Sequence, residues 1–148
     1  MSASNGANPP ATPEPVRVSL PHDRDRIDAL QNALMSAVEE AGYPKPARFA
    51  IKLAFEEALM NAFHHGHRGL GDDAEVRVEY AVTPREVVIR VEDQGPGFDP
   101  DSVPDPTLDE NLALPSGRGI MLMRAYMTAV EHNETGNRVE LRYVRSDD

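Results

Sequence analysis

The segment from Phe55 to His67 combines helical periodicity with three polar side chains that could act on a ligand. Glu57, Asn61 and His65 are four residues apart, so on an α-helix they lie along one face. That face is apolar further upstream. A carboxylate at the border of a core is costly unless water, a cation or a ligand compensates its charge. Two interpretations stay open: a carboxylate that meets solvent at the edge of the core, or one wall of a ligand site.

A second polar stripe follows the roughly opposite face of the same helix. Arg48, Lys52 and Glu56 repeat at four-residue spacing. Glu56 can pair there with Lys52, and such a pair on a solvated helix contributes a few tenths of a kcal/mol. The carboxylate expected to do chemistry is therefore Glu57, and Glu56 is its rival on the solvent side.

Two glycine pairs supply further candidate sites. The run Asp93-Gln-Gly95-Pro-Gly97 ends an expected strand, and Gly117-Arg-Gly119 opens an expected helix. Glycine permits close approach of the backbone to a ligand, and a helix N-terminus can bind an anion such as phosphate. Taken singly, each run also describes an ordinary turn or junction. The phosphate-loop pattern GxxxxGK[ST] is absent.

Composition restricts the class of protein. The chain has 148 residues, a formal net charge of −10 and no cysteine. One domain is expected from this length, and the charge argues against nucleic-acid binding, which needs clustered lysine and arginine. Disulfides and thiolate sites are excluded. No apolar run reaches the roughly 18 residues of a membrane span, and no signal pattern is visible at the N-terminus. We expect a cytoplasmic protein.

The order of expected elements indicates an α+β fold. Residues 1–15 carry four prolines and are expected to form a disordered tail, followed by a domain at 16–145 and a short tail at 146–148. The domain is expected to contain strands at 16–20, 74–82, 85–93, 128–133 and 137–144, helices at about 23–42, 47–65 and 117–127, and a loop before the third helix. We therefore predict a two-layer α/β sandwich, with about three helices on one face of a mixed, mostly antiparallel sheet.

Together, and in this order, the motifs resemble those of the Bergerat-fold ATP-binding family, which includes type II topoisomerases, sensor histidine kinases and mismatch-repair ATPases. Residues 57–65 resemble its N box, ExxxNAxxH. Residues 93–97 resemble its first glycine box, DxGxG, and residues 117–119 its second. The resemblance covers about residues 16–145. The run EAxxNAxxHG and the short lid before GRGIMLM are similar in particular to stand-alone anti-sigma-factor serine kinases of the RsbW and SpoIIAB type.

The resemblance implies a site for ATP and Mg²⁺. Asn61 would ligate the metal, Asp93 would accept a hydrogen bond from the adenine amino group, and Glu57 would be the general base. Residues 98–116 would form a lid over the triphosphate. The residues implied in nucleotide binding are Asn61, His65, Asp93, Gly95, Gly97, Gly117, Arg118, Gly119 and Ile120.

The implied function is a serine/threonine-protein kinase that phosphorylates a small anti-anti-sigma partner of the STAS type and sequesters a sigma factor, as a homodimer. The alternative is a non-catalytic module whose partner binding is modulated by nucleotide, with a sigma factor or another regulatory protein as the partner. A transition-metal site at His64, His65 and His67 is a further alternative, which the family assignment of His65 disfavours.

Two departures from the family pattern bear on the expected affinity for ATP. Gly136-Asn137-Arg138-Val139 stands where the family commonly carries a threonine-containing run near the adenine. The lid is acidic and has no lysine or arginine. Low affinity for ATP is expected if these acidic groups face the triphosphate.

Overall fold

The computed structural model describes residues 15–66, 74–95 and 117–145. The elements in chain order are β1 (Val16–Leu20), α2 (Arg24–Glu40), α3 (Lys45–Met60), the π-helix η1 (Asn61–Gly66), β2 (Val76–Val82), β3 (Glu86–Glu92), α4 (Gly117–Tyr126), β4 (Ala129–His132) and β5 (Arg138–Val144). The order predicted from the sequence is confirmed. The expected tails, except for Pro15, and the expected lid lie outside the described residues.

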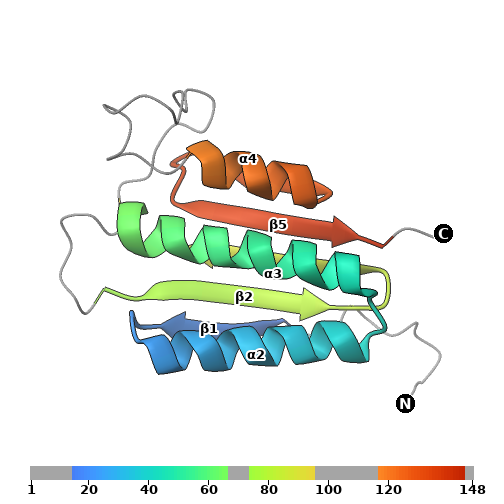
Figure 1. The fold of residues 1–148 in the computed structure, drawn as a ribbon. Helices are drawn as coiled ribbons and strands as arrows, with labels where there is room; N and C mark the ends of the chain where they lie inside the picture. The colour runs from blue at the N-terminus through green and yellow to red at the C-terminus, as the bar shows by residue number, and fades with distance from the viewer. Residues whose placement is uncertain (1–14, 67–73, 96–116, 146–148) are drawn as a thin grey trace, which may run out of the picture.

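The five strands form one sheet in the order β1-β2-β3-β5-β4. Each described pairing is antiparallel, whereas the sequence also allowed a mixed sheet. The three α-helices lie side by side on one face of this sheet (Figure 1). The α+β class and the two-layer arrangement are confirmed.

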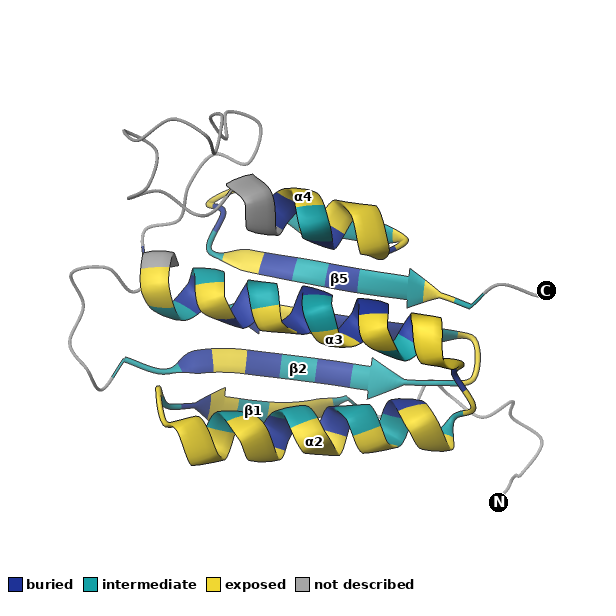
Figure 2. Ribbon diagram, viewed as in Figure 1, coloured by how far each residue is buried: buried dark blue, intermediate teal, exposed yellow. Residues whose placement is uncertain are grey.

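The core lies between the helices and one face of the sheet (Figure 2). In β3, Val87, Ile89 and Val91 are buried, and the residues between them are more exposed. Successive side chains of a strand point to opposite faces of its sheet. Each strand therefore sends alternate residues toward the helices and leaves the others on the far face.

Helix α2 packs through the stripe that its periodicity predicts. Leu30, Leu34 and Val38 are buried, and Ile27 is partly buried against the same cluster. Gly42 has a φ of +90°, a value that glycine adopts without a steric penalty and that commonly ends a helix.

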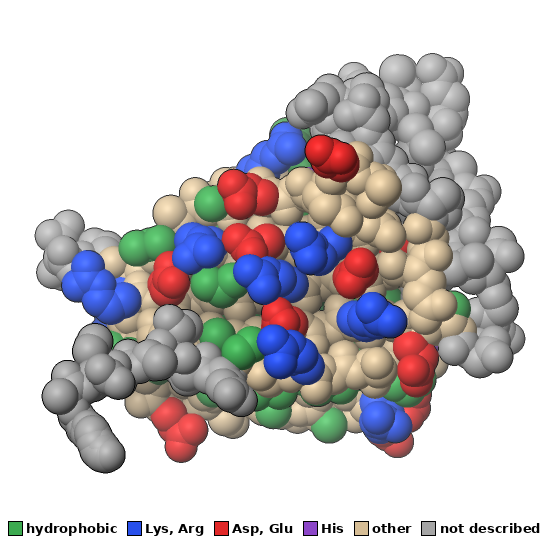
Figure 3. Space-filling view, turned by 180° about the vertical axis from the view of Figure 1, so that it is seen from behind, with side chains coloured by type: hydrophobic (Ala, Val, Ile, Leu, Met, Phe, Trp, Pro, Cys, Tyr) green, Lys and Arg blue, Asp and Glu red, His purple; other side chains and the backbone are tan. Residues whose placement is uncertain are grey.

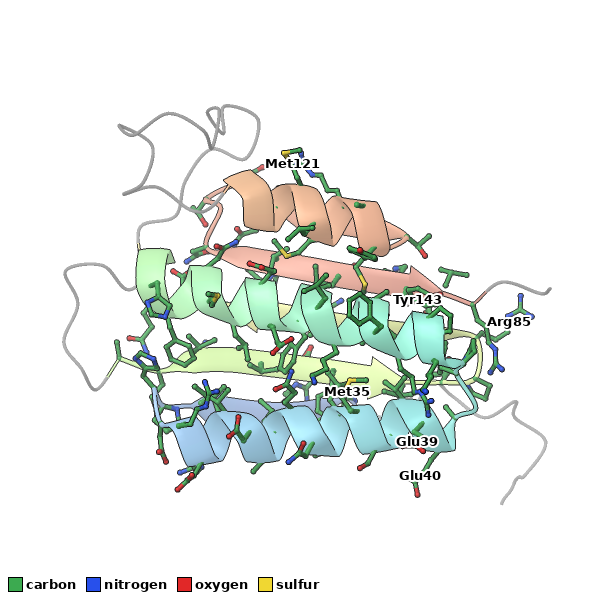
Figure 4. The ribbon with its side chains drawn as sticks, viewed as in Figure 1. Met35, Glu39, Glu40, Arg85, Met121 and Tyr143 are labelled. Carbon is green, nitrogen blue, oxygen red and sulfur yellow. The ribbon has the colours of Figure 1, made fainter. Side chains whose placement is uncertain are left out.

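The C-terminal strand fixes the end of α2 that is distant from the polar motifs. The Arg145 guanidinium donates hydrogen bonds to the carbonyl oxygens of Ala41 (3.2 Å) and Gly42 (2.7 Å). It also lies 5.1 Å from the centroid of the Tyr43 ring. The side chain of Tyr143 lies at this end of the molecule (Figure 4), and its ring meets that of Tyr43 edge to face.

The second helix differs from its prediction at its C-terminal end. The α-helix was expected to continue to about His65, but α3 ends at Met60 and the chain goes on as the π-helix η1. The amide of Asn61 donates to the carbonyl oxygens of both Glu57 and Ala58, so the helix is continuous across the junction. A π-helix bonds each amide five residues back and therefore has a wider turn. The backbone positions of Asn61 and His65 consequently do not have the spacing of an α-helical turn.

None of the helices within the described ranges is long and apolar enough to cross a membrane.

Two phenylalanines of α3 provide a test of this packing. Phe55 is 0% exposed, whereas Phe49 is 58% exposed and only meets the ring of Tyr126 at its edge. We expect Phe55→Ala to lower the free energy of unfolding by about 3–5 kcal/mol, since it leaves a cavity in the core. Phe49→Ala should cost less than about 1 kcal/mol. Urea denaturation measures both, and equal losses would contradict the described orientation of α3.

Candidate functional site

The three polar motifs come together at one end of the sandwich. Helix α3 and η1 end there, α4 begins there, and β3 arrives there because it runs antiparallel to β2 (Figure 1). The described backbone thus brings the N-box residues, Asp93 and the start of α4 to the same edge, although they are far apart in the sequence.

The two neighbouring carboxylates of α3 occupy different environments. Glu56 is exposed, whereas Glu57 is partly buried and precedes the buried residues Ala58 and Leu59. Asn61, one α-helical turn after Glu57, is also partly buried. The Glu57–Asn61 stripe therefore follows the border between core and solvent, as the spacing indicated.

Aromatic rings of the π-helix η1 contact a histidine in the connection between β1 and α2. The Phe63 ring stacks on that of His22, with centroids 4.7 Å apart, and the ring of His64 meets His22 edge-on at 5.6 Å. Single π turns occur frequently at functional sites. The side chain of His65 lies outside the described set, so its place is fixed only through the backbone of η1.

Asp93 follows β3 and is directed toward the helix side of the sheet. Val87, Ile89 and Val91 face the helices, and Asp93 continues the same alternation. Its carboxylate accepts a hydrogen bond of 2.7 Å from the amide of Gly95, which is buried. This bond orients the carboxylate. Gly97 lies outside the described residues.

A polar turn between β4 and β5 holds the main chain of Asp93. The carbonyl oxygen of Asn137 accepts a 2.9 Å hydrogen bond from the Asp93 amide. The side-chain oxygen of Asn137 accepts bonds from the Asn133 amide group (2.7 Å) and the Thr135 hydroxyl (2.8 Å). Gly136 has a φ of +77°, which suits the tight turn. Sequence reasoning placed this turn but missed its link to Asp93; the clustered Asn, Thr and Gly residues were the available signal.

Arg138 does not face the helix side. It begins β5 opposite Glu92 of β3 and is exposed, whereas the next residue, Val139, is buried in the core. By the alternation of the strand, Arg138 therefore projects from the far face of the sheet. Within the run that departs from the family pattern, the printed hydrogen bond to Asp93 is made by Asn137.

The first turn of α4 carries backbone donors that have no acceptor within the helix. Gly117, Arg118, Gly119 and Ile120 are its first four residues, and the first four N–H groups of a helix have no acceptor within it. The Ile120 side chain is buried and anchors this turn in the core. The side chains of residues 117–119 are not among those described. The turn offers backbone amides and the positive end of a helix dipole to an anion.

His132 at the end of β4 was not singled out from the sequence. Desolvation, aided by the positive charge of Arg124, lowers its pKa below the usual 6.5. It pairs with Val139 across the sheet. Within the described part of the chain, no three histidine, cysteine or acidic side chains gather into a group that could hold a metal ion.

Comparison with known proteins identifies a family that the chain matches over most of its length. Residues 20–143 match the model of the histidine kinase-like ATPase domain. The serine/threonine-protein kinase BtrW of Bordetella bronchiseptica is 34% identical over 87 residues, which are 57% of this chain and 61% of the relative. The serine-protein kinase RsbW of Listeria monocytogenes is 30% identical over 84 residues, covering 57% of this chain and 53% of the relative.

A longer match is found in Bacillus pumilus. Its serine-protein kinase RsbW is 29% identical over 124 residues, covering 78% of this chain and 76% of the relative. In the two matches from Bordetella and Listeria, the chain spans little more than half the length of the relative.

The partly buried position of His132 predicts a pH dependence. Because its folded-state pKa is lowered, the unfolded chain binds more protons as the pH falls below about 6.5. The stability contributed by the neutral imidazole is thus complete above that pH and is lost as the pH falls through the folded-state pKa. We expect an NMR titration midpoint below 6.5, and His132→Gln should flatten the decline of stability between pH 7 and 5. A midpoint at or above 6.5 would contradict the described burial.

Proposed function

The chain belongs to the histidine kinase-like ATPase domain family, and we propose that it is an ATP-dependent serine/threonine-protein kinase of the anti-sigma-factor type. The relatives that bear the name serine-protein kinase support this proposal. Residues 16–145 would form the ATP-binding domain.

One observation carries the proposal: three chemically different groups meet at a single end of the fold. These are the amide and carboxylate of the Glu57–Asn61 stripe, the oriented carboxylate of Asp93, and the backbone amides of the first turn of α4. ATP needs a hydrogen-bond acceptor for its adenine amino group, amides for its phosphates, and an oxygen ligand for their metal ion. This combination suits ATP better than it suits any ligand without phosphates.

The side chains present fit Mg²⁺ and ATP. Asn61 is partly buried at a helix end, and its amide oxygen suits a hard cation that keeps several waters. Asp93 would accept a hydrogen bond from the adenine amino group, whereas guanine presents an acceptor at that position. His65, Gly95, Gly97 and the first turn of α4, through Ile120, would complete the site. When bound, MgATP would supply the phosphoryl group and neutralise part of its charge.

Glu57 would be the general base that takes the proton from the serine or threonine hydroxyl of the target. Its partly buried position beside Asn61, against the exposed position of Glu56, supports the choice between the two carboxylates. In phosphoryl transfer the protein contributes mainly positioning and charge stabilisation, so the base is expected to supply about 10²- to 10⁴-fold.

The expected partners are a sigma factor and a STAS-type anti-anti-sigma protein, and the kinase is expected to act as a homodimer in the cytoplasm. Nucleic acid is not expected as a ligand, because the net charge is −10. If nucleotide binds without phosphoryl transfer, the alternative becomes a module whose partner binding is modulated by nucleotide.

Adjacent glutamates provide a matched test of the catalytic role. Glu57→Gln removes the proposed base and keeps its size, and Glu56→Gln makes the same change on the exposed side of α3. We expect Glu57→Gln to slow transfer of labelled phosphate from ATP to a STAS-type protein by about 10²- to 10⁴-fold, with ATP affinity within a few-fold of the native value.

The control Glu56→Gln should transfer phosphate at the native rate. Sigma-factor binding that persists in Glu57→Gln would support a bifunctional kinase. Transfer by Glu57→Gln at the native rate would remove Glu57 from the proposed role.

A further inference from the structure

The face of the sheet opposite the helices is a second, separate surface. No helix in the described part of the chain covers it. Seen from behind, it carries interspersed acidic and basic side chains with small apolar areas between them (Figure 3). These residues belong to the outward-pointing positions of β1, β2, β3 and β5.

Ion pairs order the middle of this face. Arg90 of β3 bonds to Glu79 of β2 at 3.0 Å and to Glu140 of β5 at 2.7 Å. Arg17 of β1 bonds to Glu79 at 3.0 Å, and Arg142 bonds to Glu140 at 3.4 Å. The hydrogen bond from Arg90 lowers the pKa of Glu140. Two glutamates are thus each shared by two arginines, and they leave little negative charge for a ligand to meet.

Two further arginines lie beside this network of ion pairs, and neither has a described glutamate as an ion-pair partner. Arg77 and Arg138 are the cross-strand neighbours of Glu92 on β2 and β5. Both are exposed, and neither makes an ion pair with any residue in the described ranges. Glu92 is the strand neighbour of both, but it forms an ion pair with neither of them.

These arginines line a hollow with a volume of about 420 Å³. Its charged lining consists of four arginines and two glutamates: Arg17, Arg77, Arg90, Arg138, Glu79 and Glu92. This excess of positive charge is local, in a chain whose net charge is −10. At physiological ionic strength charges more than about 8 Å apart are largely screened. The local arginines, rather than the net charge, therefore decide what the hollow attracts.

A second, smaller hollow adjoins the charged hollow. It has a volume of about 210 Å³. Ala81 and Val88 contribute apolar lining, and Glu79, Glu86, Arg90 and Arg142 contribute charged lining. Glu79 and Arg90 line both hollows, so the two are contiguous. Small apolar side chains bordered by arginines and glutamates lie next to the charged hollow, and arginine is enriched in protein–protein interfaces.

We propose that this far face of the sheet is a docking surface for an acidic segment of a partner protein. Carboxylates of the segment would pair with Arg77 and Arg138, and one apolar side chain would lie over Ala81 and Val88. Two features favour a peptide over nucleic acid as the ligand. They are the two glutamates that line the charged hollow and the apolar side chains of the adjoining hollow. The surface faces away from the Asn61–Asp93 end of the helix side, so the proposal does not depend on nucleotide binding.

A charge-reversal pair tests the proposal. The double variant Arg77→Glu/Arg138→Glu reverses the two unpaired arginines. The control Arg26→Glu/Arg85→Glu makes the same change of charge on exposed residues of α2 and of the β2–β3 turn. The probe is a short, fluorescently labelled peptide that is rich in Asp and carries one Leu. Its affinity is measured by anisotropy, and the contacted residues by amide shifts in NMR spectra of the full chain.

We expect saturable binding that shifts amides of β1, β2, β3 and β5 and weakens as salt rises. Exposed ion pairs are individually weak, so the double reversal should weaken binding about tenfold, while the control stays within about twofold of native. The spectrum of each free variant reports whether it is folded. An equal loss in the control, or shifts confined to the helix layer, would overturn the proposal.

Two other occupants are tested in the same assay. Tighter binding of a single-stranded oligonucleotide than of the peptide would overturn the proposal in favour of a nucleic-acid surface. Sedimentation that shows a dimer of the native chain, converted to a monomer by Arg77→Glu/Arg138→Glu, would assign the face to a second copy. Either result contradicts the acidic-segment proposal.

Discussion

Burial of one face of the sheet determines where every functional side chain lies. The helices cover a single side, so the strands send their buried apolar residues to that side and most of their charged residues to the other. In β3 this alternation directs Val91 into the core and Glu92 outward, and it turns Asp93 back toward the helices. The proposed nucleotide site and the proposed docking surface thus occupy opposite faces of the same strands.

The hydrogen bond between the Asp93 amide and the Asn137 carbonyl oxygen connects these strands at the functional end. It joins the end of β3 to the turn before β5, and the side chain of Asn137 braces that turn. A site gains precision when its ligand-binding groups are held by paired strands and packed helices. The family resemblance assigns no role to Asn137, yet in this chain it positions the backbone of the proposed adenine-binding residue.

Local sequence patterns were sufficient to predict the α-helices and the strands. Most of what they missed depends on how strands pair with one another. The α2 stripe through Leu34 and the alternation of β3 are periodic within one segment, so both were recognisable. The π-helix was missed because the motif spacing fits an α-helix equally well. The placement of Arg138 and the arginine–glutamate network depends on pairing between strands that are distant in sequence, such as β3 with β5.

The most direct test of the account is calorimetric titration of the native chain with ATP and GTP in the presence of Mg²⁺, repeated with Asp93→Asn and with the exposed control Asp25→Asn. The account predicts saturable ATP binding by the native chain and the control, and little binding of GTP. Loss of a hydrogen bond to a charged group, worth about 1.5–3 kcal/mol, should weaken ATP binding by Asp93→Asn at least about tenfold. The account would be contradicted if the native chain bound no ATP at millimolar concentration. It would also be contradicted if the native chain bound GTP as tightly as ATP, or if Asp93→Asn bound ATP as tightly as the native chain.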